Sequence, residues 1–458
     1  MFANKRLYGL IFLVLFSTFL FSCGNDDDDD SNNNNSQFLG ETVWVKTFGG
    51  SSDEDAVSVV QSNDGNYVVL ASTKSTDGDV TGKTTTDLDF WLLKIDANGE
   101  KIWDRTYGGS LQDKARSISK TLDGGYILSG FTASSDGDIT ENAGFHDYWI
   151  IKVNANGDIQ WQKTFGFEGQ DQAYKVIQTS DGGFIATGFL DVGASNGEGN
   201  DFNDSTNETR NTLHSLGDFW AIRLDANGNK IWRRYFGGTH VEQGKDVLET
   251  EDGGFLLVGN SESSDFDVTN AHGSHDFWAI KISAEGDKLW ENSFGGLQSD
   301  FAFAVTNTSD GNFILVGDTR SSDADVSNPL GNADAWVVKF SGSNGNLIWE
   351  KTYGGLEFDS ARGIIKLENN KYAIAANTRS NNNDVSNHYG SNDAWVLIID
   401  DSGNLDFEKN IGGTDLDFAN NLVETNNNEI IFVGNTDSDD IDITINKGSK
   451  DILIFKLK

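Results

Sequence analysis

The sequence predicts an all-β fold, a seven-bladed β-propeller built from four-stranded antiparallel blades. The first observation is a unit that recurs seven times at spacings of 58 or 59 residues, with one longer spacing of 71. The second is that all twelve tryptophans fall at two positions of this unit. The later position holds Trp44, Trp103, Trp161, Trp232, Trp290, Trp349 and then Phe407; the earlier holds Trp91, Trp149, Trp220, Trp278, Trp336, Trp395 and then Leu453. The third is that each unit contains four short stretches separated by turn residues, which is typical of a four-stranded meander.

The second unit illustrates the four predicted strands. They are DKARSISKT at 113–121, GYILSGF at 125–131, DYWIIKV at 147–153 and IQWQKTF at 159–165. Asp123-Gly124 joins the first two strands and Asn156-Gly157 joins the last two, because these dipeptides favour the backbone of tight hairpin turns. The third stretch is apolar almost throughout, so it should be covered on both faces. We expect the tryptophans to pack between neighbouring blades.

Closure of the ring is predicted from the order of the strand types. A single meander of this size cannot bury its own faces, whereas seven stacked radially cover every face and leave only short edges. A strand of the fourth type lies at 42–48, before the first complete unit, and the stretch at 451–458 is of the third type. We expect the two to pair, so that the N-terminal strand completes the last blade.

The first 22 residues are predicted to be a lipoprotein signal peptide. Lys5 and Arg6 precede an apolar run that ends at Cys23, the one cysteine of the chain, and this run is too short for a comfortable membrane span. The sequence from Leu20 to Cys23 resembles a bacterial lipobox. The resemblance implies cleavage before Cys23 and acylation of its thiol and new amino terminus; an ordinary secretory signal is the alternative.

Residues 23–40 are predicted to be the lipidated cysteine and a disordered acidic tether, because five consecutive aspartates repel one another and offer nothing to bury. The acidic run after Cys23 also resembles the surface-export signals of Bacteroidetes lipoproteins, with a plain spacer as the alternative. We therefore expect a lipid-anchored protein of the outer membrane, exposed at the cell surface, with the propeller occupying residues 41–458.

The repeats resemble the SBBP-type β-propeller repeats of bacterial secreted and surface proteins. The resemblance rests on the pattern G-G, D-x-A, D-G, G-x-T, D-x-x-V-x-K, G and W, and it extends over residues 41–458. It implies the propeller fold but no particular function. The DANG segment with its following tryptophan also resembles the docking repeat of quinoprotein propellers. Seven units and a single cysteine speak against a quinone cofactor.

Composition narrows the partners and the function. The net charge is −37, with 71 acidic against 34 basic residues, so the surface repels phosphate backbones and no nucleic-acid partner is expected. The sequence contains no GxSxG, HExxH or Walker motif. We expect a non-catalytic binding or scaffold module for a protein or glycan ligand, held to the membrane through its lipid alone. The alternative is a polysaccharide hydrolase or lyase with its site on the face formed by the loops between strands two and three.

Acidic residues repeat at three positions on that face. One opens the first strand of every unit: Glu54, Asp113, Asp171, Glu242, Asp300, Asp359 and Asp417. One precedes the third strand: Asp89, Asp147, Asp218, Asp276, Asp334, Asp393 and Asp451. We expect both sets to accept backbone N–H groups. The third is a D-x-D pair in five of the loops: Asp77, Asp79, Asp136, Asp138, Asp265, Asp267, Asp323, Asp325, Asp440 and Asp442. These pairs either form turns or bind Ca²⁺, the one candidate cofactor, which favours oxygen ligands.

The third unit breaks the symmetry. Its loop at 191–217 accounts for the spacing of 71 and lacks the D-x-D pair. It carries Asp201, Asp204, Glu208, Arg210 and His214 instead. A longer loop on one blade is either a ligand site or surface decoration, and these five residues are the candidate ligand loop.

Overall fold

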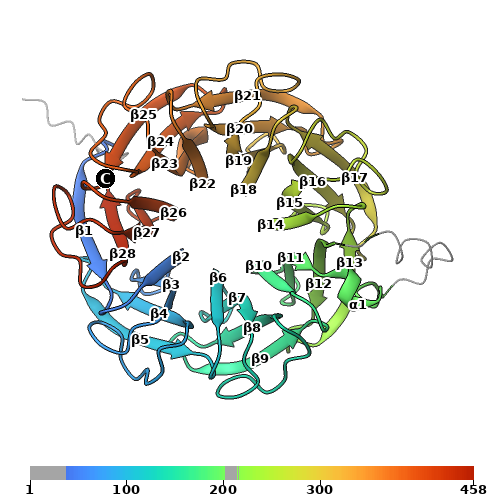
Figure 1. The fold of residues 1–458 in the computed structure, drawn as a ribbon, viewed down its shortest axis with the longest axis horizontal. Helices are drawn as coiled ribbons and strands as arrows, with labels where there is room; N and C mark the ends of the chain where they lie inside the picture. Colours follow the sequence, from blue (N-terminus) through green and yellow to red (C-terminus); the bar gives the residue numbers. More distant parts are fainter. Residues whose placement is uncertain (1–37, 202–213, 215) are drawn as a thin grey trace, which may run out of the picture. The chain divides into compact units, whose positions relative to one another are not determined.

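The computed structural model describes residues 38–201, 214 and 216–458. From residue 38 onward the chain forms a ring of seven four-stranded antiparallel sheets (Figure 1). The first strand of each sheet lies at the centre of the ring and the fourth lies at the rim. This arrangement confirms the predicted seven-bladed β-propeller.

Each blade follows the chain from the centre outward. Blade one consists of β2 (Glu54–Gln61), β3 (Tyr67–Thr73), β4 (Asp89–Ile95) and β5 (Lys101–Tyr107). Blade two consists of β6 (Asp113–Lys120), β7 (Tyr126–Thr132), β8 (Asp147–Val153) and β9 (Ile159–Phe165). Blade three consists of β10 (Gln172–Gln178), β11 (Phe184–Leu190), β12 (Asp218–Leu224) and β13 (Lys230–Phe236), with helix α1 (Val192–Ser195) after β11. Blade four consists of β14 (Glu242–Glu249), β15 (Phe255–Ser261), β16 (Asp276–Ile282) and β17 (Lys288–Phe294). Blade five consists of β18 (Asp300–Asn307), β19 (Phe313–Thr319), β20 (Asp334–Phe340) and β21 (Leu347–Tyr353). Blade six consists of β22 (Asp359–Lys366), β23 (Lys371–Thr378), β24 (Asp393–Asp400) and β25 (Leu405–Ile411), with the 3₁₀ helix η1 (Glu368–Asn370) after β22. Blade seven consists of β26 (Asp417–Glu424), β27 (Ile430–Thr436), β28 (Asp451–Leu457) and β1 (Thr42–Phe48).

The seventh blade is assembled from both ends of the described chain. Strand β1 pairs antiparallel with β28, from Thr42 opposite Leu457 to Phe48 opposite Ile452. The amide of Leu39 also donates to the carbonyl of Lys458 at 3.0 Å. The predicted closure by the N-terminal strand is therefore present.

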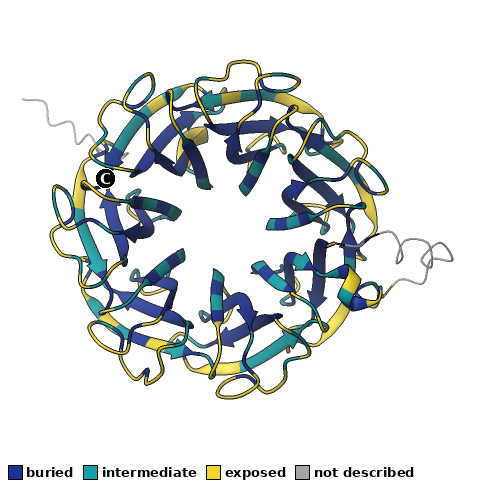
Figure 2. Cartoon of the chain, viewed as in Figure 1, coloured by how far each residue is buried: buried dark blue, intermediate teal, exposed yellow. Residues whose placement is uncertain are grey.

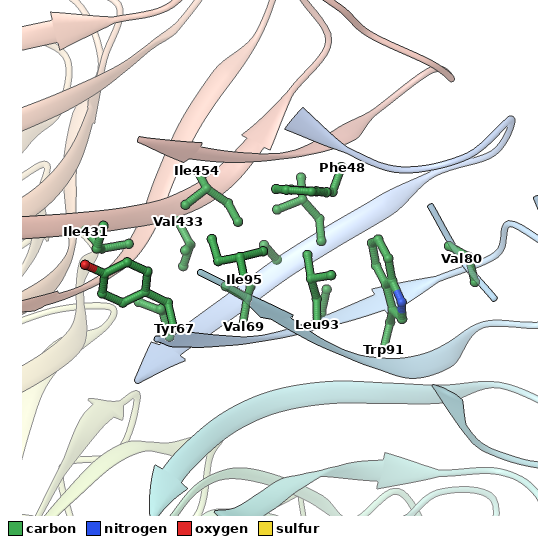
Figure 3. Packing of buried hydrophobic residues seen from close by; sticks show 14 residues of the cluster. Phe48, Tyr67, Val69, Val80, Trp91, Leu93, Ile95, Ile431, Val433 and Ile454 are labelled. Atoms are coloured by element: carbon green, nitrogen blue, oxygen red, sulfur yellow. The ribbon is translucent and has the colours of Figure 1, made fainter. Parts of the chain in front are cut away.

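The core lies between blades, and the second and third strands carry most of it. Every residue of β4 and of β8 is buried, which matches their apolar sequences (Figure 2). The cluster between blades one and seven shows the pattern: Trp91 and Leu93 of β4 pack with Phe48 of β1 and Ile454 of β28 (Figure 3). Burying large side chains on both faces of a sheet supplies the main favourable term in its stability.

The two tryptophan positions both join neighbouring blades, as predicted. Trp149 of blade two lies edge-on to Phe90 of blade one, with ring centroids 4.8 Å apart. Trp232 belongs to the other position, and its indole N–H donates to the carbonyl of Ala284 in the next blade at 3.0 Å. The described part of the chain contains no helix that is long and apolar enough to cross a membrane.

Candidate binding site in the central channel

The acidic residues that open the first strands hold the crossover, the segment that leads from one blade into the next. In blade two the carboxylate of Asp113 accepts hydrogen bonds from the amide of Gly109 at 2.7 Å and from the hydroxyl of Ser134 at 2.9 Å. It also accepts one from the hydroxyl of Thr132. All seven residues at this position are fully buried. They therefore fix the backbone rather than face a ligand.

The aspartates that were expected to precede the third strands are the first residues of those strands, and they lie close to this first set. Asp147 accepts a hydrogen bond from the amide of Ala143 at 2.6 Å, and burial raises its pKa to about 6. Burial raises the pKa of Asp171 to about 7, and the nearby charge of Asp147 adds to the effect. In blade four, burial likewise raises the pKa of Glu242 to about 7. Raised pKa values often mark functional carboxyl groups, but these groups lie beneath the crossovers, out of reach of a substrate.

The D-x-D pairs also bind the crossovers. In blade two, Asp136 accepts from the amide of Ser110 at 2.8 Å and Asp138 accepts from the amide of Gly108 at 3.1 Å. The described residues contain no group of three or more His, Cys, Asp or Glu side chains that could hold a metal ion. The pairs of the other four loops make the same two types of contact: Asp77, Asp79, Asp265, Asp267, Asp323, Asp325, Asp440 and Asp442. These bonds explain why the pairs repeat and favour the turn-forming interpretation, with Ca²⁺ binding as the alternative.

The long loop of blade three is described only at its ends. The carboxylate of Asp201 pairs with Lys230 at 2.7 Å and with Arg233 at 3.2 Å. His214 is buried, and its Nδ1 lies 2.5 Å from a carboxylate oxygen of Asp218. The remaining candidates of this loop, Asp204, Glu208 and Arg210, lie outside the described residues.

A cavity of about 390 Å³ lies in the central channel, which is the space enclosed by the seven first strands. Each first strand has a β-bulge, and the bulged residue is the one three positions after the opening acidic residue. A bulge leaves its extra residue out of the sheet ladder and redirects the side chain. The seven bulge residues all line the cavity: Val57, Arg116, Tyr174, Lys245, Phe303, Arg362 and Asn420.

Three of the bulge residues are cations packed on the aromatic rings of two others. The Lys245 ammonium lies 3.9 Å from the centre of the Tyr174 ring, and the Arg116 guanidinium carbon lies 4.8 Å from the same centre. The Arg362 guanidinium carbon lies 3.9 Å from the centre of the Phe303 ring. Such contacts attract a cation to the ring face without neutralising its charge.

The cavity lining is positively charged although the protein is strongly acidic. Its four basic residues, Arg116, Lys175, Lys245 and Arg362, outnumber its two acidic residues by two. Both acidic residues are engaged: Asp246 lies 3.5 Å from Lys175, and Asp55 lies 3.3 Å from Lys114 at the edge of the cavity.

The other three cations, Arg116, Lys245 and Arg362, have no carboxylate within 4.0 Å among the described residues. Burial and the charges of Arg116 and Arg362 together lower the pKa of Lys245 to about 7. The lysine therefore loses its proton at a much lower pH than an exposed lysine does.

None of these residues was predicted from the sequence, because function was expected at positions that repeat. The sequence does mark them, because the bulge position of the first strand varies from unit to unit while the residue before it repeats. The residue before the bulge is alanine in six blades and Gly244 in the remaining one, whereas the bulge residue itself takes six different types. Aligning the first strands and placing them at the centre of the ring would have brought the three cations together.

The fold and the channel define a seven-bladed β-propeller with an aromatic and cationic central cavity. No family model matches the chain, so membership of the SBBP-type repeats stays a prediction. The Regulatory protein FlaEY of Caulobacter vibrioides is 26% identical over 170 residues, which is 32% of this chain but only 17% of that protein.

Three solved structures illustrate the structural similarity, each with a TM-score below 0.5. The WD40 domain of Pan2 from Neurospora crassa aligns with 91% of this chain and 94% of its own length, at 8% identity and a TM-score of 0.49. A protein of unknown function from Dyadobacter fermentans aligns with 91% of this chain and 98% of its own length, at 12% identity and a TM-score of 0.43. Another from Bacteroides caccae aligns with 79% of this chain and 94% of its own length, at 12% identity and a TM-score of 0.39. The fold assignment rests on the strand topology itself.

Proposed function

We propose that this protein is a non-catalytic binding propeller that holds its ligand in the central channel. The observation that carries the proposal is the contrast between repeated and divergent positions of one strand. The buried residue before each bulge is small in every blade, because sheet packing requires it. The bulge residue one position later diverges, although the backbone there is the same in all seven blades. Divergence at one place in a symmetrical scaffold points to a ligand that is not symmetrical.

The cavity has the size and lining of a ligand site. Its volume of about 390 Å³ falls within the range of roughly 300–1,000 Å³ that is common for small-molecule pockets. Tyr174 and Phe303 provide flat apolar surface, while Asn420 and Asn421 add neutral hydrogen-bonding groups. A small molecule, or the end of a glycan or protein chain, fits this combination.

We further propose that Cys23 anchors the propeller to the outer membrane, with the ring exposed at the cell surface. The support is the lipobox-like sequence from Leu20 to Cys23 and the acidic run that follows it. A lipid chain on that cysteine would hold the protein at the bilayer without a membrane-spanning segment.

Hydrolysis or elimination of a polysaccharide, with a site on the face formed by the loops between strands two and three, is the alternative function. Both reactions need an acid and a base that reach the substrate. On that face the acidic residues of the three repeated positions accept hydrogen bonds from backbone amides, as Asp113, Asp136 and Asp147 do in blade two. This use of the carboxylates favours binding without turnover.

A ligand screen with product analysis tests this proposal. Glycans, peptides and small metabolites would be tested for stabilisation of the wild type and of Tyr174→Ala, and each stabilising compound would be recovered and weighed by mass spectrometry. We expect at least one class to stabilise the wild type more than the variant and to be recovered intact. Cleaved products would establish an enzyme, and equal stabilisation of both proteins would place the site outside the channel.

A further inference from the structure

The charge balance of the channel is opposite to that of the whole chain. Acidic residues outnumber basic ones by 71 to 34 overall, so carboxylates were available to neutralise any buried cation. The cavity nevertheless brings Arg116, Lys245 and Arg362 together, and none of them forms an ion pair within 4.0 Å among the described residues. The charge of the buried Asp318 acts on Arg362 alone of the three. Gathering like charges in a partly desolvated cavity destabilises the free protein, and a ligand of opposite charge removes that cost.

We propose that the channel binds an oxyanion carrying two or more negative charges between Arg116, Lys245 and Arg362. This inference rests on the proposed binding function of the channel and names the chemistry of the ligand. Sulfate, phosphate and polycarboxylate groups share this chemistry, whether as free ions or as substituents of a larger molecule.

The geometry suits one multivalent group. The Lys245 ammonium and the Arg116 guanidinium carbon both approach the Tyr174 ring, at 3.9 and 4.8 Å from its centre, so they are no more than about 9 Å apart. The charge of Arg362 also acts on Lys245, so the three cations share one region of the cavity, where each can give a charge-assisted hydrogen bond of about 2.8 Å to the same multivalent group.

Two of these cations have unused hydrogen-bond donors. The Nε atom of Arg116 is buried and has no hydrogen-bond partner among the described residues. Lys245 makes one hydrogen bond, to the side-chain oxygen of Gln243 at 2.7 Å, which leaves two of its three ammonium protons for a ligand. Buried donors are normally satisfied, so the Arg116 Nε indicates an acceptor that the described residues do not supply.

Binding should be coupled to protonation of Lys245. The charged groups that line the cavity around it are Arg116 on β6, Lys175 on β10, Asp246 on β14, Arg362 on β22 and Asp55 on β2, and Asp318 on β19 acts on Arg362. The neutral groups are Gln243, Tyr174, Phe303 and Asn420. Because burial and the two arginines hold the lysine pKa near 7, an anion beside it favours the charged form. The site should therefore bind more tightly at pH 6 than at pH 8.5.

Isothermal titration calorimetry on the full chain tests the inference, with sulfate as the first probe because sulfate does not titrate in this range. We expect saturable binding that NaCl at matched ionic strength does not mimic. Arg116→Met and Lys245→Met should each weaken it by about tenfold or more, the usual cost of a lost hydrogen bond to a charged group. Lys120→Met, on the exposed end of β6, is the matched control and should bind like the wild type. If Arg116→Met does not fold, Lys245→Met and the pH profile of the wild type still decide the matter.

Further titrations distinguish a free anion from an anionic substituent, and they test the oxyanion inference separately from the proposed binding function. Citrate and inorganic phosphate represent free ions, and a sulfated disaccharide beside its unsulfated counterpart represents a glycan substituent. A preference for the sulfated sugar over sulfate itself would assign a glycan source. Equal binding of both disaccharides, lost in Tyr174→Ala, would overturn the oxyanion inference but leave the binding function intact. Sulfate binding that none of the channel variants changes would show an adventitious ion only and would also overturn the inference.

Discussion

Trp44→Ala tests whether the N-terminal strand closes the ring in solution. Trp44 lies on β1, yet its indole N–H donates to the carbonyl of Ala97 in blade one at 3.2 Å. Its ring also packs closely over the turn at Gly99, where an added methyl carbon would lie 3.3 Å from it. The side chain therefore joins the first and last blades across the seam of the ring.

The expected cost follows from the area that Trp44 buries. A fully buried tryptophan covers up to about 250 Å², and Trp44 is only partly buried. Taking about half of that area at about 25 cal/mol per Å² gives a loss of about 3 kcal/mol in the free energy of unfolding. An unfolding entropy of about 2.1 cal/mol/K per residue over residues 38–458 converts this loss into a fall of about 3 °C in the melting temperature.

Trp349→Ala is the matched control, and scanning calorimetry is the assay. Trp349 occupies the same position on β21, is also partly buried, and donates to the carbonyl of Asp401 in the next blade at 3.2 Å. The two blades that Trp349 joins follow one another in the chain, so this site does not depend on ring closure by β1. Replacing Trp349 with alanine should lower the melting temperature by about the same amount. A melting temperature that falls for Trp349→Ala but stays unchanged for Trp44→Ala would refute closure by β1.

Three further predictions concern pH, anchoring and calcium. The melting temperature should fall as the pH rises from 5 to 8. Burial raises the folded-state pKa values of Asp171 and Glu242 to about 7 and those of four further aspartates to about 6, so these six groups make the native state bind more protons than the unfolded state in this window. Lys245, His146 and His275, whose pKa values burial lowers, act in the opposite direction and are outnumbered. A melting temperature that rises over this range would contradict that assignment. Cys23→Ala should move the protein from the membrane fraction to the soluble fraction after a salt wash, and continued sedimentation with membranes would exclude the lipid anchor. Millimolar Ca²⁺ and ionic-strength-matched NaCl should give the same melting temperature, because the D-x-D carboxylates already bind crossover amides; a specific rise with Ca²⁺, reversed by EDTA, would establish coordination by these pairs.

Repetition made the fold accessible from the sequence. The tryptophan positions, the Asp-Gly turns and the apolar third strands each recur, and the structure places them as predicted, with Gly124 at a φ of +82° and Gly157 at +81°. The strand types at 42–48 and 451–458 were enough to predict the closure at β1 and β28. A pattern that recurs in seven units identifies the strands and turns more reliably than the sequence of any single blade.

The candidate site could not be predicted in the same way. The cavity depends on seven side chains that are 58 to 71 residues apart in sequence and meet only when the ring closes. The acidic positions drew attention because they repeat, but their repetition reflects the backbone bonds of the crossovers. The β-bulge that turns Arg116 and Lys245 into the channel has no residue type of its own to mark it.

The central claim is that the channel binds an anion with uptake of a proton by Lys245. The most direct measurement is the enthalpy of sulfate binding at pH 7 in two buffers that differ in ionisation enthalpy. Because burial and the two arginines lower the lysine pKa to about 7, binding should take up a fraction of a proton, which appears as a dependence of the enthalpy on the buffer. We expect this dependence in the wild type and its disappearance in Lys245→Met. Sulfate binding with the same enthalpy in both buffers, or no binding at all, would contradict the account.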